Sequence, residues 1–248
     1  MIDGLRTARG VLRSLRIYYG DGRRRAAMQA LYAAFVGDGD LVFDIGAHVG
    51  DRIAAFRRLG ARVVAVEPQP ALVKTLRLLY GRDSAVAIEA AALGRAAGTI
   101  ALRLNPDNPT VSTASDEFIA AARRAPGWRG QMWTRSVAVT MTTLDRLIAR
   151  HGLPQFAKID VEGFEAEALF GLSQPIPALS FEFTTIQRDV AQTCLQRCQA
   201  LGLVRYNAAL GESQELVHAS WIGADEIARW LMALPVEANS GDIYARLG

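Results

Sequence analysis

The first third of the chain alternates short apolar runs with amphipathic segments, and this alternation restricts the fold more than any other feature. The apolar runs "LVFDIGA", "ARVVAVEP" and "SAVAIEAAALG" cover residues 41–47, 61–68 and 84–94. Between them, residues 50–60 and 70–81 have the apolar spacing of helices and end in glycine, a common stop signal. Buried strands that alternate with helices form parallel sheets with right-handed crossovers. The sequence therefore predicts an α/β fold.

The rest of the chain continues this pattern after one interruption. The further predicted strands cover residues 98–104, 136–142, 156–160, 178–184, 203–210, 214–220 and 241–248. The further predicted helices cover residues 142–152, 161–172, 188–202 and 224–234. Residues 105–135 contain Pro106 and Pro109, which exclude a central strand, and they are interpreted as an exposed insertion. We predict one domain over residues 39–248, preceded by a helical extension over residues 1–38.

Composition excludes several classes of protein. The chain has 248 residues, half of them hydrophobic, which is enough for one large core. No run of about 18 apolar residues occurs, so we expect no transmembrane helix. The first residues lack the continuous apolar centre of a secretory signal. Cys194 and Cys198 lie one helical turn apart, and we interpret them as core thiols rather than a disulfide framework. These features are typical of a cytoplasmic protein.

Positive charge gathers in the first 36 residues. The whole chain has a net charge of +3, whereas this segment has seven arginines against Asp3 and Asp21. An apolar stripe lies beside arginines at helical spacing; it comprises Leu5, Ala8, Leu12, Leu15 and Tyr19. Such a helix could contact an anionic membrane surface or an acidic substrate. We favour the alternative that its apolar stripe docks on the core while its arginines face solvent. It also offers one surface for a homodimer, and it lacks the aromatic and lysine interleaving of a nucleic-acid-binding surface.

Four acidic residues stand at or near the carboxyl ends of predicted strands: Asp44, Glu67, Asp160 and Glu182. In doubly wound sheets, ligands bind over these ends. Any one acid is explained by the favourable dipole at the start of the next helix, worth about 0.3–1 kcal/mol. Four acids along one edge are explained better by a ligand site.

The corner "GAHVG" distinguishes between cofactor classes. His48 occupies the position where a dinucleotide fold needs a second glycine, and Asp44 would repel a pyrophosphate. Both features disfavour NAD and FAD. S-adenosylmethionine has an amino group and a sulfonium but no phosphate, so Asp44 would attract its positive end. Gly46 and Gly50 allow a tight turn beside the methionyl part, and Glu67 can accept both ribose hydroxyls.

The motifs "FDIGAHVG", "VVAVEP", "AAALG", "TTLD" and "KIDVEGFEAEALFGL" occur in this order. With them the chain resembles the FkbM-like family of S-adenosylmethionine-dependent methyltransferases, from about Leu41 to about Phe183. The resemblance implies a class I, Rossmann-like fold with a mostly parallel seven-stranded sheet flanked by helices and an antiparallel last strand. It implies O-methylation of hydroxyls on small molecules, sugars or natural products.

The resemblance also implies which residues bind the cofactor. These are Asp44, Gly46, Ala47, His48, Gly50, Glu67, Pro68, Ala90, Ala91 and Asp160. The family often has a polar residue at the turn formed by Ala90 and Ala91, where this chain has alanine. A side-chain contact to the adenine amine must then come from elsewhere, and Glu89 is one source.

Methyl transfer to a hydroxyl requires an oriented nucleophile and a group that takes its proton. We predict Asp160 as this base, with Glu182 and His48 as alternatives. Strand alternation places Lys158 on the same face as Asp160, so an ion pair between them is expected, although Lys158 itself is interpreted as a snorkelling side chain. Glu162 either takes part in catalysis or substrate contact, or is an acid that stabilises the start of the next helix.

Several alternatives stay open. Asp160 with Glu182 could hold Mg²⁺, but the pairing is not specific and no metal is assigned. The acceptor could be an amine, or the chain could be a non-catalytic S-adenosylmethionine-binding module; a nicotinamide oxidoreductase is disfavoured.

Other aromatic and histidine side chains have a structural and a functional interpretation. In the insertion, Trp128, Met132 and Trp133 either stack on the acceptor or form a lid. Packing roles are favoured for Trp221, Trp230 and His218, and a surface position for His151.

Overall fold

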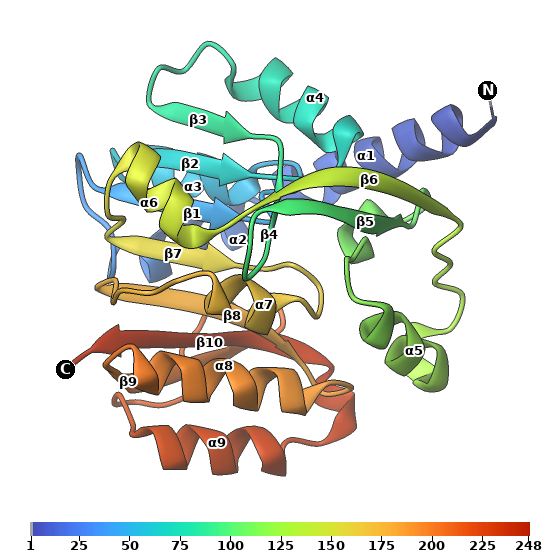
Figure 1. Cartoon of the computed structure of the whole chain (residues 1–248). Helices are drawn as coiled ribbons and strands as arrows, with labels where there is room; N and C mark the ends of the chain where they lie inside the picture. The colour runs from blue at the N-terminus through green and yellow to red at the C-terminus, as the bar shows by residue number, and fades with distance from the viewer. Residues whose placement is uncertain (1) are drawn as a thin grey trace.

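A computed structural model describes residues 2–248 and confirms the α/β fold with a mostly parallel seven-stranded sheet (Figure 1). The strands of this sheet are β1 (Leu41–Ile45), β2 (Arg62–Val66), β3 (Val86–Glu89), β7 (Phe156–Ile159), β8 (Ala178–Thr184), β9 (Leu203–Leu210) and β10 (Ser240–Leu247). Their order is β3-β2-β1-β7-β8-β10-β9. The last strand, β10, pairs antiparallel with both β8 and β9, as the family resemblance implies.

Helices cover both faces of the sheet, because successive side chains of each buried strand point to opposite faces. One face packs on α6 (Leu144–His151), α7 (Glu165–Phe170), α8 (Arg188–Ala200) and α9 (Ala224–Ala233). The other packs on α2 (Gly22–Tyr32), α3 (Asp51–Arg58) and α4 (Pro70–Tyr80). In β1, for example, Val42 belongs to the second core and Phe43 to the first.

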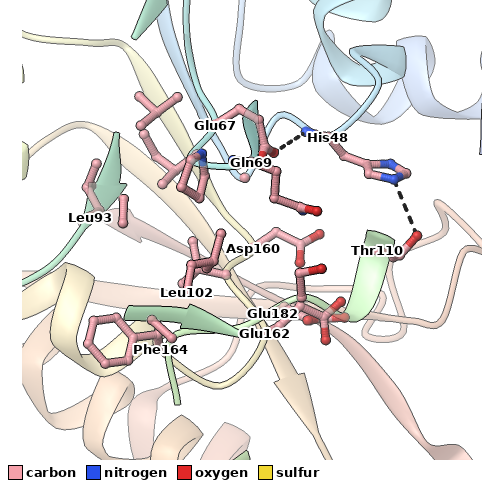
Figure 2. A pocket seen from close by; sticks show the side chains of 18 of the residues that line it. His48, Glu67, Gln69, Leu93, Leu102, Thr110, Asp160, Glu162, Phe164 and Glu182 are labelled. Atoms are coloured by element: carbon pink, nitrogen blue, oxygen red, sulfur yellow. Dashed lines mark hydrogen bonds between the residues drawn. The ribbon is translucent and has the colours of Figure 1, made fainter. Parts of the chain in front are cut away.

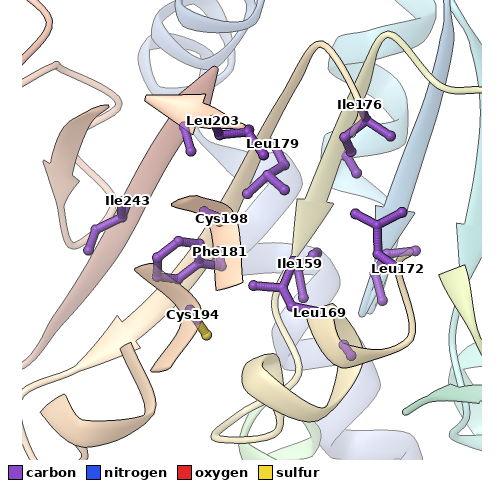
Figure 3. Close-up of a cluster of buried hydrophobic side chains, with 14 of the residues drawn as sticks. Ile159, Leu169, Leu172, Ile176, Leu179, Phe181, Cys194, Cys198, Leu203 and Ile243 are labelled. Carbon is purple, nitrogen blue, oxygen red and sulfur yellow. The ribbon is translucent and has the colours of Figure 1, made fainter. Parts of the chain in front are cut away.

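The larger core contains both cysteines (Figure 3). Cys194 and Cys198 on α8 are fully buried and not joined in a disulfide. They pack among aliphatic side chains such as Leu179 and Leu203. The interpretation of these residues as core thiols is confirmed.

A second, three-stranded sheet lies beside the carboxyl ends of the main strands (Figure 1). It consists of β4 (Ala92–Leu93), β5 (Gly98–Leu104) and β6 (Arg135–Thr142), in the order β4-β6-β5. Sequence analysis predicted β5 and β6 as strands without recognising that they form a sheet of their own. The insertion between them contains η1 (Pro109–Val111), α5 (Asp116–Arg124) and η2 (Pro126–Trp128).

The predicted strand at 214–220 is wrong: no strand of the described chain covers it. At His218, hydrogen bonds from the side-chain amide of Asn207 take the place of backbone pairing with a neighbouring strand. Its oxygen accepts from the backbone N–H of His218 at 3.0 Å, and its nitrogen donates to the His218 carbonyl at 2.8 Å. Bonds from a side chain compete with regular pairing of the backbone.

The N-terminal helix α1 (Ile2–Gly20) docks on the domain with a face that overlaps the predicted one but is rotated from it: Leu15 and Tyr19 pack against the domain, as expected. Val11 is buried, whereas Leu5 and Leu12, expected to dock, are 62% and 64% exposed. The cause is Gly10, where a Cβ atom would lie only 2.7 Å from the Pro106 carbonyl oxygen. The insertion therefore approaches α1 along its glycine and sets the rotation of the helix. Over residues 2–248, no helix combines the length and apolarity needed to span a membrane.

Candidate active site

A cavity that is open to solvent lies over the carboxyl ends of β1, β2, β7 and β8 (Figure 2). The small sheet adds an apolar wall through Leu93 and Leu102, and Phe164 extends it. Acidic side chains occupy another part of the same cavity, so one space has an apolar and an acidic half.

The corner after β1 needs glycine at two positions. Gly46 has φ +81° and Gly50 has φ +86°, conformations that other residues seldom adopt. A Cβ atom on Gly46 would lie 1.8 Å from the Asp160 carbonyl oxygen, because the ends of β1 and β7 approach closely here. A Cβ atom on Gly50 would lie 2.6 Å from the ring of Tyr80. Neighbouring atoms therefore leave no room for a side chain at either position of the corner.

Glu67 is fixed by two backbone amides. The N–H of His48 donates to its Oε2 at 2.9 Å and the N–H of Gln69 donates to its Oε1 at 2.8 Å. Each carboxylate oxygen can accept a further hydrogen bond, so the group presents two acceptors in a fixed orientation. Burial raises the pKa of Glu67 to about 8. Hydroxyl donors at this position would offset the cost of burying its charge.

Asp44 is 1% exposed, and within residues 2–248 neither of its carboxylate oxygens has a hydrogen-bond partner. Burial raises the pKa of Asp44 to about 7. A buried polar group without a partner is costly and signals a missing ligand or water. Asp44 does not itself line the cavity, so its role at the cofactor stays a prediction. It lies behind the corner formed by Gly46.

The structure separates the predicted cofactor residues into two groups. Those that line the cavity are Gly46, His48, Glu67, Pro68, Ala91 and Asp160. Those that do not are Asp44, Ala47, Gly50 and Ala90. Ala90 is exposed because the turn points it outward. Glu89 is also directed away, since it accepts hydrogen bonds from Arg150 at 2.9 Å and pairs with His151 at 2.8 Å.

Lys158 and Asp160 form the expected ion pair, with Nζ 3.1 Å from Oδ2. Lys158 does not snorkel, however: it is fully buried, and its Nζ also donates to Asp242 on β10 at 2.8 Å. Nη2 of Arg52 on α3 lies 3.6 Å from the same Oδ2 atom of Asp160. Burial acts to raise the pKa of Asp160, but the two cations outweigh it, and the pKa is lowered. Asp160 is therefore ionised at neutral pH.

Three carboxylates converge in the acidic half (Figure 2). Asp160 follows β7, Glu162 lies in the next turn, and Glu182 is on β8. One oxygen from each lies within 4.8 Å of the other two. Burial raises the pKa of Glu162 and of Glu182 well above the usual value. We call Asp160, Glu162 and Glu182 the acid cluster.

His48 lies at the mouth of the corner, with φ 49°. Its ring packs edge-on against Tyr18 of α1 at 5.2 Å, and its Nε2 lies 3.4 Å from the Thr110 hydroxyl. Burial lowers the pKa of His48 to about 4, so the ring is neutral at pH 7. It can therefore accept a proton only weakly.

Sequence reasoning missed side chains from distant segments that also line the cavity: Tyr18, Arg52, Gln69, Thr110, Ser112 and Glu212. No local signal marked Tyr18 or Glu212, which reach the site only through the fold. Arg52 lies two residues after Gly50, and an arginine in the first turn after a cofactor corner was a signal available to notice.

The tryptophans of the insertion do not line the cavity, and neither does Met132, which is 60% exposed. Trp128 and Trp133 instead pack edge-on against Phe118 of α5, with ring centroids 5.1 and 6.2 Å away. Trp133 also donates to the Val111 carbonyl at 2.7 Å. The hypothesis that they stack on an acceptor is not supported by this arrangement. They hold the insertion together.

A parallel sheet with a glycine corner and an acid at the next strand end is the arrangement of doubly wound enzymes that bind a nucleoside cofactor. A sequence model described as "Methyltransferase FkbM domain" matches residues 44–218. The chain belongs to the FkbM methyltransferase family. It is an S-adenosylmethionine-dependent methyltransferase, as the motifs implied.

Comparison with solved structures found methyltransferases at low sequence identity. An O-methyltransferase from Bacillus cereus in complex with SAH has 10% identity and a TM-score of 0.46, covering 96% of this chain and 90% of that one. Aeropyrum pernix fibrillarin with bound S-adenosyl-L-methionine has 9% identity and a TM-score of 0.45, covering 89% and 73%. A precorrin-6y C5,15-methyltransferase from Geobacter metallireducens has 12% identity and a TM-score of 0.42, covering 90% and 87%. A search of curated proteins found no match.

Proposed function

We propose that this enzyme transfers the methyl group of S-adenosylmethionine to a hydroxyl of a small molecule, sugar or natural product. One observation carries the proposal: a single cavity joins the glycine corner and Glu67 to a cluster of carboxylates. The cofactor supplies an already activated methyl group. The chain must therefore bind the cofactor, orient an acceptor oxygen and remove its proton.

The cofactor half suits S-adenosylmethionine without any phosphate contact. The Glu67 carboxylate, oriented by two amides, would accept the ribose hydroxyls. The turn at Gly46 lets the methionyl part pass close to the backbone, and the unpartnered Asp44 behind it would attract the ammonium group. Ala91 and Leu93 give an apolar border for the adenine.

For the proton acceptor, the geometry favours Glu182 over Asp160. Oε2 of Glu182 is buried and has no hydrogen-bond partner within residues 2–248, whereas Oδ2 of Asp160 is paired with both Lys158 and Arg52. A proton acceptor must reach the hydroxyl that it deprotonates, and the unpaired oxygen of Glu182 is free to do so. We assign proton removal to Glu182 and a positioning role to Asp160. His48 is left as a cavity-lining residue that helps to shape the entrance.

Acceptor choice would depend on two segments outside the strand ends. Tyr18 comes from the N-terminal helical extension, residues 1–38, and Thr110 and Ser112 come from the insertion at 105–135. Both segments close the cavity over the sheet. We propose that they select a small acceptor, with residues 39–248 supplying the catalytic domain.

Isothermal titration calorimetry with S-adenosylhomocysteine and with NAD tests the cofactor assignment directly. We expect binding of the first compound and none of the second. Transfer from methyl-labelled S-adenosylmethionine to a library of hydroxylated and aminated compounds then tests the acceptor. Products labelled only on nitrogen, or binding without any transfer, would reject O-methylation.

A further inference from the structure

We propose that the acid cluster binds one divalent hard cation, of the Mg²⁺ or Mn²⁺ class, and that this ion holds the acceptor by two neighbouring oxygen atoms. The proposed metal binding is argued from the geometry and the missing partners of the acid cluster, and it does not depend on the proposed function. The second part rests on the proposed O-methylation. The acceptor class that follows is a vicinal diol, or a hydroxyl beside a carbonyl or carboxylate.

The spacing of the cluster suits one shared ion. One oxygen each from Asp160, Glu162 and Glu182 lies within 4.8 Å of the others. Metal–oxygen distances are about 2.0–2.1 Å for Mg²⁺ and 2.3–2.6 Å for Ca²⁺, so ligands on opposite sides of an ion are about 4–5 Å apart. A set made only of carboxylate oxygens suits Mg²⁺, Mn²⁺ or Ca²⁺ rather than softer metals.

Glu162 gives an independent indication of a ligand. Only 7% of the residue is exposed, yet it lines the cavity and its carboxylate points at those of Asp160 and Glu182 (Figure 2). In the described part of the chain, no hydrogen bond or ion pair involves this carboxylate. Within the same residues, Oε2 of Glu182 is buried and also has no partner. Carboxylates in this state are costly unless a proton or a cation meets them.

Among the described residues, the nearby cations reach the acid cluster only at Asp160. Lys158 lies between Asp160 and Asp242, at 3.1 and 2.8 Å. Arg52 is shared among Asp160, Asp51 and Glu212. Of the residues the structure describes, none brings a positive charge within ion-pair distance of Glu162 or Glu182. A bound divalent ion would supply the charge that the chain itself does not.

The ion would complete the acceptor half in a simple way. It would keep two acceptor oxygens in fixed positions and lower the pKa of the hydroxyl among them. That O–H bond breaks as its proton passes to the free carboxylate oxygen of Glu182. The oxygen then forms a bond to the methyl carbon while the S–CH₃ bond breaks, which leaves neutral S-adenosylhomocysteine. Because each carboxylate needs to offer only one oxygen to the ion, the other stays available.

Electron paramagnetic resonance of Mn²⁺ measures occupancy without any acceptor or turnover. Titration of the full chain should show one bound Mn²⁺, which Mg²⁺ displaces. Glu162→Gln should weaken Mn²⁺ binding at least about 10- to 100-fold, the range seen even for residues that only support metal ligands. Glu212→Gln is the matched control: it removes the same charge from the same cavity outside the cluster, and Mn²⁺ affinity should be retained.

Calorimetry with S-adenosylhomocysteine on each variant shows that the fold and cofactor half are intact; if Glu162→Gln fails this check, Glu182→Gln replaces it. No Mn²⁺ uptake by the unmodified chain, or equal losses in the cluster and control variants, would overturn the proposal. Methylation that proceeds at full rate in EDTA would overturn the acceptor role while leaving O-methylation intact. Mn²⁺ binding that depends on Glu162, without any O-methyl product, would support the metal site and reject the proposed function.

Discussion

The two halves of the cavity surround their buried glutamates in opposite ways. In the cofactor half, both oxygens of Glu67 receive a backbone N–H, at 2.8 and 2.9 Å. In the acceptor half, Glu162 and Glu182 face each other, and inside residues 2–248 no donor or cation is directed at the Glu162 carboxylate. The first half is oriented before the ligand arrives. The second is completed by what binds, so substitutions in the two halves should have different consequences.

The largest effect is expected from Gly46→Ala. The new Cβ atom would lie 1.8 Å from the Asp160 carbonyl oxygen, so β1 and β7 would have to separate. We expect a loss of more than about 4 kcal/mol in unfolding free energy and no binding of S-adenosylhomocysteine. Urea denaturation and calorimetry measure both.

Gly39→Ala is the matched control for this substitution. Gly39 has φ +79°, almost the same as Gly46, but nothing lies within 4 Å of the added Cβ. It should cost only the left-handed strain, about 1–2 kcal/mol, and leave ligand affinity unchanged. Similar losses in both variants would show that φ, rather than the approach of β7, makes glycine necessary at position 46.

The next effect is expected from Glu67→Gln. The amide removes the charge, and its NH₂ group must face one of the two backbone N–H donors. Hydrogen bonds to a charged group contribute about 1.5–3 kcal/mol, so the Kd for S-adenosylhomocysteine should rise about 10- to 100-fold. Glu89→Gln, at the end of the neighbouring strand but bound to Arg150 and His151, should leave the Kd unchanged. A larger loss from Glu89→Gln would place the ribose elsewhere.

The difference between the halves also explains what could be predicted from sequence. The cofactor half is formed by residues that directly follow β1 and β2, so the sequence motifs "GAHVG" and "VEP" were enough to predict its position. The acceptor half combines side chains that are far apart in the chain, such as Tyr18, Glu162 and Glu212. Local sequence patterns do not indicate which distant side chains come together in the folded chain. Strand position also predicts the face of the sheet but not whether a side chain reaches the cavity, and Asp44 at the end of β1 does not line it.

A smaller, graded effect is expected from pH. Burial raises the pKa of Glu67 to about 8, and the ribose hydroxyls need its ionised form. Cofactor binding should therefore release a proton, and affinity for S-adenosylhomocysteine should fall up to about tenfold for each pH unit below 8. Asp44, whose pKa burial raises to about 7, adds to this below pH 7. Calorimetry in buffers of different ionisation enthalpy counts the protons.

Stability without ligand should have the opposite dependence on pH. The folded pKa of Glu67 is above its ordinary value of 4.5, so the folded state holds more protons between pH 4.5 and about 8. Its contribution to the unfolding free energy is therefore lost as the pH rises through this range. Glu67→Gln should flatten both profiles. Unchanged profiles in that variant would show that Glu67 does not titrate there.

The smallest effect is expected where the insertion supports the acceptor half without lining it. Trp133→Phe keeps an aromatic ring against Phe118 but removes the N–H that donates to Val111 at 2.7 Å. We expect a loss of about 0.5–1.5 kcal/mol in unfolding free energy by urea denaturation, and unchanged affinity for S-adenosylhomocysteine. Met132→Leu, at a residue 60% exposed, should change neither quantity. If Trp133→Phe left stability intact and abolished methyl transfer, we would conclude that Trp133 contacts the acceptor. It would then belong to the acceptor half of the cavity rather than to the insertion that supports it.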